Sequence, residues 1–120
     1  MNEKLALAAG PQWPAVRDIT LGELLREAAE TVPDRIALIS GVKDPVQRRS
    51  WTYRELYAQA YLAAQVLGQK FQPGERVAVF APNSPEWVML EFACAMAGVV
   101  LVTINPAYRA KEVTYVLTQS

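Results

Sequence analysis

Apolar residues recur at helical spacing early in the chain, directly after a capping motif. Thr20 and Glu23 form a T-x-x-E capping box, in which each side chain accepts a hydrogen bond from the backbone N–H group of the other residue. The positions that follow place one apolar face on a helix, and they are Leu21, Leu24, Leu25, Ala28 and Val32. We predict that this helix ends at Pro33, because the residue before a proline avoids the helical conformation.

Two short segments of strand-favouring residues with a turn between them are typical of a β-hairpin. Residues 36–39 are continuously apolar, and residues 50–52 provide the returning strand. Asp44 and Pro45 mark a turn in the polar connection, because both residue types favour turn conformations. We therefore predict an antiparallel element over residues 36–52.

A second capping box, formed by Thr52 and Glu55, begins a longer helix. The inward face of this helix consists of small and aliphatic residues, namely Leu56, Ala60, Ala63, Ala64 and Leu67. We predict that Gly68 ends the helix, since glycine favours the backbone conformation that follows a helix.

The chain then alternates between an apolar strand, a capped helix and a second apolar strand. Residues 77–80 and 99–104 are continuous apolar runs, which are typical of parallel strands covered on both faces. Ser84 and Pro85 begin the helix between them, and Gly98 ends it. We predict a parallel β-α-β unit with a right-handed crossover.

The remaining residues define the predicted limits of the fold. Asn105 and Pro106 break the second strand, and a last helix is predicted to run to Ser120. Residues 1–19 show no periodicity and are interpreted as an extended lead-in. A β-α-β unit followed by a helix is expected to continue into another strand. Residues 20–120 are therefore predicted to be an α/β subdomain that is truncated before its sheet is complete.

Composition and charge exclude several classes of function. Of the 120 residues, 52% are hydrophobic, and 12 basic residues balance 12 acidic ones. This balance gives no net field that attracts nucleic acid, so a nucleic-acid partner is not expected. The sequence has no histidine and only one cysteine, which excludes a disulfide framework and a Cys/His zinc site. We interpret Cys94, which lies in an apolar run, as a core residue.

The longest apolar run, residues 87–104, is not predicted to be a transmembrane segment. Glu91 lies within it, and a charge near the centre of a span costs about 2.5–3.5 kcal/mol. Gly98 divides the run into a helix-favouring half and a β-branched half. The first apolar stretch of the chain is too short for a secretory signal, and a free thiol suits a reducing compartment, so we predict a cytoplasmic protein.

Four stretches, in this order and spacing, resemble the adenylate-forming enzymes. Residues 51–56 (WTYREL) are similar to the first core motif of that superfamily, and residues 95–106 (AMAGVVLVTINP) are similar to the second. Between them, residues 74–79 (GERVAV) and 82–87 (PNSPEW) follow the same pattern. The resemblance covers about residues 20–120 and implies the amino-terminal part of the adenylate-forming fold. Within the superfamily, the loop sequence NPAYRA looks most like medium- and long-chain fatty acyl-CoA synthetases.

The resemblance implies a two-step reaction. A fatty acid carboxylate attacks the α-phosphate of ATP, which gives an acyl adenylate and pyrophosphate, and coenzyme A (CoA) then takes the acyl group as a thioester. The full-length enzymes of this family use ATP, Mg²⁺ and CoA. Their phosphate loop, later acidic and arginine residues, and catalytic lysine come from segments that this sequence does not contain. These 120 residues alone are therefore expected to have no catalytic residue, no metal site and no bound cofactor, and to be inactive.

One loop of this chain is expected to contact CoA in the full-length enzyme. Asn105, Pro106, Tyr108 and Arg109 follow the carboxyl end of a predicted parallel strand, where open α/β sheets bind their ligands. In some enzymes that the chain resembles, the matching loop approaches the nucleotide end of CoA. Tyr108 offers a ring for adenine, and Arg109 offers a guanidinium for a phosphate. The alternative is that Asn105 and Pro106 only end the strand, while Tyr108 packs on the next helix and Arg109 is solvated.

Two further features are interpreted as structural. The loop of residues 81–85 lies between a strand and a helix, but its prolines remove N–H donors and Glu86 adds a negative charge. It is therefore poorly suited to bind phosphate. Tyr53, Tyr57 and Tyr61 recur on one face of a helix, and we predict that they form a packed aromatic face.

Two alternative functions remain open on the sequence. Another adenylating enzyme, such as an aryl-CoA ligase, a luciferase-like enzyme or a peptide-synthetase adenylation domain, has the same motifs, since the acid-selecting residues lie downstream. A non-catalytic α/β binding or assembly module, which buries its open sheet edge in an oligomer, belongs to a different class. Because of the same open edge, we expect the isolated chain to self-associate or to be only marginally stable.

Overall fold

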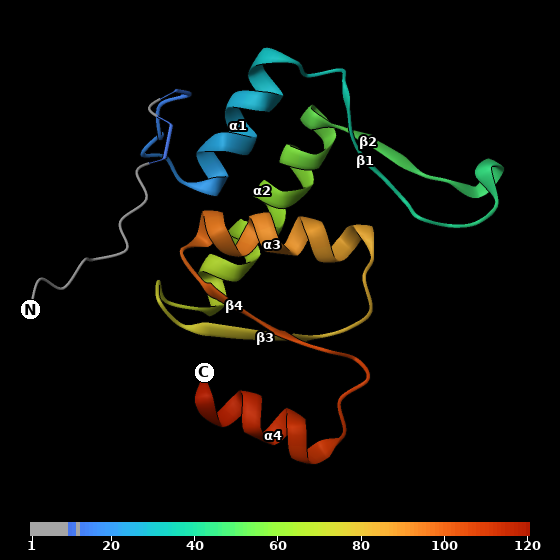
Figure 1. The fold of residues 1–120 in the computed structure, drawn as a ribbon. Helices are drawn as coiled ribbons and strands as arrows, with labels where there is room; N and C mark the ends of the chain where they lie inside the picture. The colour runs from blue at the N-terminus through green and yellow to red at the C-terminus, as the bar shows by residue number, and fades with distance from the viewer. Residues whose placement is uncertain (1–9, 12) are drawn as a thin grey trace, which may run out of the picture.

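The structure consists of three packed helices, a β-hairpin, a parallel strand pair and a last helix (Figure 1). It is a computed structural model that describes residues 10, 11 and 13–120. Residues 1–9 and 12 of the predicted lead-in lie outside the described residues, and the described part of the lead-in contains no helix or strand. The α/β fold class that the sequence predicts is confirmed.

Helix α1 spans Leu21–Thr31 and begins at its predicted capping box. The Glu23 N–H donates to Thr20 Oγ1 at 3.1 Å, and the Thr20 N–H donates to Glu23 Oε2 at 2.8 Å. The pKa of Glu23 is lowered below its ordinary value, mainly by the hydrogen bond from the Thr20 backbone N–H. The side chain of Leu25 points from this helix into the core.

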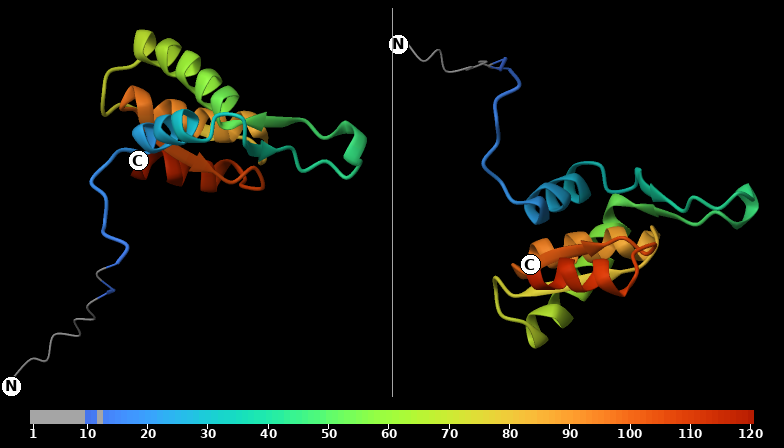
Figure 2. Two further views of the ribbon diagram at one scale, coloured as in Figure 1. Left: turned by 90° about the horizontal axis from the view of Figure 1, so that it is seen from above. Right: turned by 60° about the horizontal axis from the view of Figure 1, so that its bottom comes forward.

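The hairpin pairs β1 (Ile36–Ile39) with β2 (Ser50–Thr52) in the predicted antiparallel orientation. Leu38 lies opposite Trp51, whose side chain is buried. A short 3₁₀ helix, Pro45–Gln47, forms the turn between the strands. The hairpin projects from the body of the molecule, so only its base contributes to the core (Figure 2).

Helix α2 spans Tyr53–Lys70 and also begins at its predicted capping box. The prediction of its end was wrong, because the helix continues through Gly68 and stops at Lys70. A glycine inside a helix costs only about 1 kcal/mol, which the packing of the preceding turns offsets. The chain reverses instead after Pro73, where Gly74 has a positive φ of 87°.

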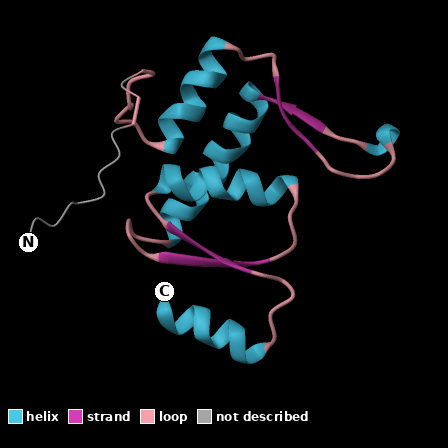
Figure 3. Cartoon of the chain, viewed as in Figure 1, coloured by secondary structure: helices cyan, strands magenta, loops and turns pink. Residues whose placement is uncertain are grey.

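The predicted parallel β-α-β unit is confirmed and consists of β3 (Arg76–Phe80), α3 (Pro85–Ala97) and β4 (Val100–Ile104) (Figure 3). The two strands pair in phase along their whole length. Ser84 caps the start of α3, and Gly98 ends the helix in the left-handed conformation with a φ of 69°. Both helix limits agree with the sequence prediction.

The parallel strand pair is covered by a helix layer on one face and only in part on the other. Helix α3 forms this layer, whereas α4 (Ala110–Gln119) lies on the opposite side and contains no buried residue, although the structure describes all of it (Figure 1). Phe80 and Val100 are consequently 54% and 48% exposed. Within the described residues only one helix layer packs on these strands, so the predicted cover of their second face stays a prediction.

The main core joins the first three helices to the base of the hairpin. It is one cluster of buried apolar residues, namely Leu25, Trp51, Leu56, Ala60 and Met89. Cys94 is buried in α3, as predicted, and burial raises the pKa of its thiol. Across residues 10, 11 and 13–120, no helix combines the length and hydropathy needed to cross a membrane.

Replacing Gly98 with alanine is expected to lower the free energy of unfolding by about 1 kcal/mol, because alanine is strained at a positive φ. The matched control is Gly68→Ala, which adds a Cβ inside α2 where no atom lies within 4 Å. This control is expected to raise the free energy of unfolding by about 0.5–1 kcal/mol. The free energy of unfolding of the two variants is measured by urea unfolding. If both substitutions change it in the same direction, the positive φ of Gly98 does not set its contribution to stability.

The capping box of α2 predicts a pH dependence of stability. The Thr52 backbone N–H, followed by the Thr52 hydroxyl, lowers the pKa of Glu55 below its ordinary value of 4.5. A carboxylate with a lowered pKa stabilises the folded state above its unfolded pKa, and this stability is lost as pH falls through the folded pKa. Glu55→Gln retains a capping side chain but removes the titration.

The stability of the wild type over Glu55→Gln is therefore expected to shrink as pH falls below about 4.5, measured as the difference between their urea midpoints. Thr52→Ser keeps both capping bonds and should retain the pH dependence of the wild type. If the difference in urea midpoint between wild type and Glu55→Gln stays constant across this pH range, the hydrogen bond from Thr52 to Glu55 does not contribute to the pH dependence of stability.

Candidate functional site

A cavity lies at the carboxyl ends of the two parallel strands. Its volume is about 580 Å³, and its wall includes residues 81–83 after β3 and residues 103–106 at the end of β4. Trp87 of α3 and Val116 of α4 also line it. Open α/β sheets bind ligands at this edge, so the cavity is the candidate functional site.

Three of the four residues predicted as a binding site meet at this cavity. Asn105, Pro106 and Tyr108 line it, whereas Arg109 is exposed and is not among the lining residues. The side chain of Tyr108 is 39% exposed and also borders a smaller hollow along α4. The ring is thus accessible from outside the chain, as a stacking surface requires.

Asn105 holds the turn that leads from β4 to the last helix. Its Oδ1 accepts a hydrogen bond from the Ala107 N–H at 2.9 Å, and its backbone oxygen accepts one from the Tyr108 N–H at 2.9 Å. The side-chain amide oxygen is therefore committed to the turn. In this respect the structure agrees with the alternative interpretation of Asn105 as a residue that ends the strand.

Arg109 is the capping residue of α4. Its N–H donates to Glu112 Oε2 at 2.8 Å, which closes the first turn of the helix. Within the described residues its guanidinium forms no ion pair. The residue is exposed and, among the described residues, its side chain has no ion-pair partner that it must leave in order to reach an anionic ligand.

The loop after β3 contributes walls to the cavity but is unsuited to bind an anion. Ser84 Oγ already accepts from the Trp87 N–H at 3.3 Å, and Glu86 forms an ion pair with Arg49 at 2.9 Å. The hydrogen bond from Arg49 is the main cause that lowers the pKa of Glu86, so this carboxylate stays negative beside the helix start. The structure therefore supports the structural interpretation of this loop.

Some walls of the cavity come from outside the predicted loop and were not expected from the sequence. Trp87 and Thr103 line the cavity, although neither was a candidate, and Asn83 lies in the loop of residues 81–85 that we interpret from the sequence as structural. One usable signal was present, because Asn83 and Asn105 both lie just beyond the carboxyl end of a parallel strand. Trp87 lines the cavity only because of how α3 packs. No local sequence pattern predicts this position.

The cavity has the groups for binding but not for phosphate chemistry. None of its lining residues within the described chain is charged, so it offers no cation for a developing negative charge. The same part of the chain contains no group of three or more His, Cys, Asp or Glu that would hold a metal ion. The described residues therefore do not fit a Mg²⁺ site, and the site supports contact with a ligand only.

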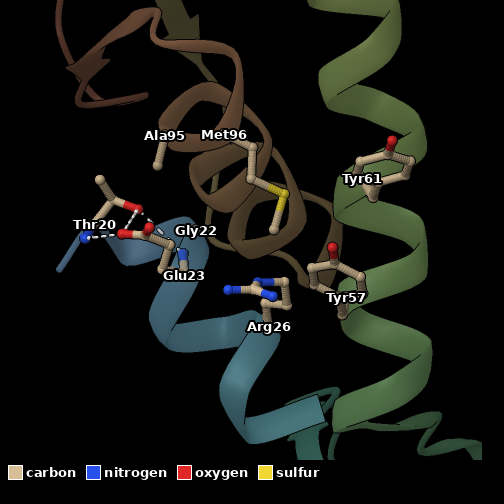
Figure 4. Close-up of a pocket in the computed structure, with 8 residues that line it drawn as sticks. All are labelled: Thr20, Gly22, Glu23, Arg26, Tyr57, Tyr61, Ala95 and Met96. Atoms are coloured by element: carbon tan, nitrogen blue, oxygen red, sulfur yellow. Dashed lines mark hydrogen bonds between the residues drawn. The ribbon is translucent and has the colours of Figure 1, made fainter. Parts of the chain in front are cut away.

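A second hollow of about 270 Å³ lies between α1, α2 and α3 (Figure 4). Arg26 of α1, Tyr57 and Tyr61 of α2 and Met96 of α3 line it. The two tyrosine rings stack with centroids 6.0 Å apart, and Tyr57 packs on the core, although Tyr61 is 48% exposed. The predicted aromatic face is thus packed at Tyr57 and open at Tyr61. This hollow lies away from the strand ends. Its carboxylate, that of Glu23, already accepts hydrogen bonds from Thr20 within the α1 capping box.

The family model and two similar curated proteins indicate the same family of enzymes. A model of the family described as AMP-binding enzyme matches residues 25–120. An acyl-CoA ligase named SID4 from Ajellomyces capsulatus is 38% identical over 99% of this chain and 20% of its own length. A mitochondrial medium-chain acyl-CoA ligase, ACSF2 from Danio rerio, is 36% identical over 82% of this chain and 16% of its own length.

A solved structure with the same arrangement is the amino-terminal subdomain of NpsA from Klebsiella oxytoca in complex with anthranilyl-AMSN. It superimposes with a TM-score of 0.74 and 30% identity, over 82% of this chain and 25% of the other. The chain spans about a fifth of the length of the curated relatives that it matches. The family match and the shared fold together show that the chain belongs to the AMP-binding enzymes and corresponds to the amino-terminal part of their fold.

Proposed function

We propose that the protein is an ATP-dependent acyl-CoA ligase that acts on a fatty acid. In this reaction a carboxylate oxygen bonds to the α-phosphorus of ATP and pyrophosphate leaves. The thiol of CoA then attacks the acyl carbonyl, and AMP leaves. The observation that carries the proposal is the similarity to acyl-CoA ligases over nearly the whole chain, including one named for medium-chain acids.

Within this enzyme, we assign the cavity at the strand ends and its adjoining loop to the nucleotide end of CoA. Tyr108 presents an accessible ring, and Arg109, the next residue in the sequence, is exposed. A planar base stacks on an aromatic ring, while a guanidinium donates two parallel hydrogen bonds to a phosphate. Asn105 and Pro106 fix the turn that positions these two side chains.

The catalytic groups of the proposed reaction lie outside this chain. ATP and Mg²⁺ would be bound elsewhere in the full-length enzyme, because the described residues lack both a metal cluster and a charged cavity wall. On this proposal residues 20–120 are a subdomain that supports the site, preceded by a lead-in over residues 1–19. A cytoplasmic location is part of the proposal, although one relative carries the word mitochondrial in its name.

A second candidate is an adenylating enzyme that selects an aryl acid. It is favoured by the similarity to the NpsA subdomain, whose structure contains an anthranilyl ligand. A panel of acids in the pyrophosphate-exchange assay separates the two candidates. Exchange that depends on medium-chain or longer alkanoic acids supports the first, and exchange that depends only on benzoate-type acids would replace it with the second.

Replacing Arg109 with alanine in the full-length enzyme is expected to raise the KM for CoA by roughly 5- to 30-fold, because one charge-assisted hydrogen bond to a phosphate is lost. The adenylation half-reaction should be unchanged. Arg48→Ala, at the tip of the hairpin, is the matched control and should affect neither step. If Arg109→Ala behaves like wild type in both half-reactions, the assignment of this loop to CoA is wrong.

Residues 1–120 expressed alone are expected to show no acid-dependent exchange of pyrophosphate into ATP and no thioester formation. The cavity wall carries no charged side chain, and the described residues contain no metal-holding group, to stabilise the charge that develops on the phosphate. The assay is compared with a heat-treated sample of the same protein. Turnover above that background would place catalytic groups within this chain.

A further inference from the structure

A hollow separates the hairpin from the loop that forms one wall of the candidate cavity. Its volume is about 380 Å³, and it is lined by residues 38–41 of the hairpin and residues 83–85 of the loop. Asn83 also lines the cavity at the strand ends, so the loop is a wall between the two spaces. Direct packing on the hairpin therefore does not hold this face of the loop.

A single ion pair links the hairpin to the start of α3. Arg49, which directly precedes β2, contacts Glu86 in the first turn of α3, with 2.9 Å between Arg49 Nη2 and Glu86 Oε1. Among the described residues, no other ion pair or hydrogen bond joins the hairpin to the loop or to α3. The loop leads directly into α3, and Ser84 caps this helix. A contact that fixes Glu86 therefore also fixes the end of the loop.

The side chain of Arg49 is ordered by other groups of the hairpin. Its Cζ lies 4.9 Å from the centre of the Trp51 ring, and Trp51 is buried in the main core. The Arg49 N–H donates to Ser40 Oγ at 2.8 Å, and the Ser40 N–H donates to the Arg49 oxygen at 2.9 Å. An exposed ion pair is usually weak, in part because two long side chains must be ordered. The contact with Trp51 already orders Arg49, which reduces this cost.

We propose that Arg49 is a positioning residue, which holds the loop of residues 81–85 in the conformation that forms the wall of the cavity. Arg49 does not line the cavity and acts through Glu86. When the ion pair is broken, the loop populates more conformations, and the apparent affinity of the cavity falls with the fraction that forms the wall. That the ligand is the nucleotide end of CoA rests on the proposed function, whereas the link from the hairpin to the loop does not.

The link is tested on the full-length protein by hydrogen exchange followed by mass spectrometry. Arg49→Ala is expected to speed exchange in residues 81–88 by roughly 2- to 5-fold, the effect of losing an exposed ion pair. Arg54→Ala is the matched control, because it removes an exposed ion pair with Asp34, at 3.1 Å, that does not involve the loop or α3. It should leave exchange in residues 81–88 unchanged. Unchanged exchange in this segment of Arg49→Ala would overturn the proposal.

A double-mutant cycle separates the ion pair from other effects of removing an arginine. Glu86→Gln should also speed exchange in residues 81–88, and the double variant should exceed neither single change, because both break the same pair. Arg49→Lys keeps the charge but not the planar fork, so it should retain part of the protection. High salt should speed exchange in the wild type more than in Arg49→Ala, because it screens an exposed pair. Fully additive effects of the two single changes would contradict the proposal.

The consequence for the cavity is tested by kinetics of the full-length enzyme. Arg49→Ala should raise the KM for CoA by roughly 2- to 5-fold at unchanged kcat, and Arg49→Lys should restore part of the change. A variant that only unfolds more easily would lose active enzyme, which lowers kcat and leaves KM unchanged.

Arg109→Ala separates failure of the positioning role from failure of the proposed CoA site. If Arg109→Ala raises the KM for CoA and Arg49→Ala does not, Arg49 does not position the wall for this ligand, and the proposal is overturned. If neither variant changes this KM, the assignment of the cavity to CoA fails. Faster exchange in residues 81–88 of Arg49→Ala would then still support the link from the hairpin to the loop.

Discussion

The packing of α3 against α2 is the constraint on which the rest of this fold depends. Four of the six buried side chains of the two helices are small, namely Ala60 and Ala64 on α2 and Ala93 and Cys94 on α3, and the other two are Leu56 and Met89. Small side chains let the helix axes approach closely, and larger ones would force the helices apart. Helix α3 in turn carries the parallel strand pair on its other side. The cavity at the strand ends is therefore positioned by a helix contact that lies outside it.

The sequence predicts best where a local signal sets the structure. Both capping boxes and the turn at Gly98 place helix ends correctly, because the groups that form them lie within four residues of each other. The end of α2 is missed for the opposite reason. Gly68 is a local stop signal, yet the helix continues because packing of its inner face outweighs a penalty of about 1 kcal/mol.

The candidate site shows the same division between local and tertiary information. The turn at Asn105 follows from residues that are adjacent in sequence, and it could be predicted. The contribution of Trp87 arises only when α3 has packed, so no spacing rule finds it. The exposed face of the strand pair is also invisible to the sequence pattern. Continuous apolar strands indicate burial on both faces, but they do not say which part of the protein provides the second layer.

The in-phase pairing of β3 with β4 limits how the length of this protein can vary between relatives. Each residue of β3 pairs with the residue 24 positions later, from Arg76 with Val100 to Phe80 with Ile104. Deleting one residue within either strand shifts the register, and a one-residue slip turns every following side chain of that strand to the other face of the sheet. The hairpin loop between β1 and β2 carries no such restriction, since it projects from the body of the molecule. Insertions and deletions should therefore accumulate in that loop, while the paired strands β3 and β4 keep their length.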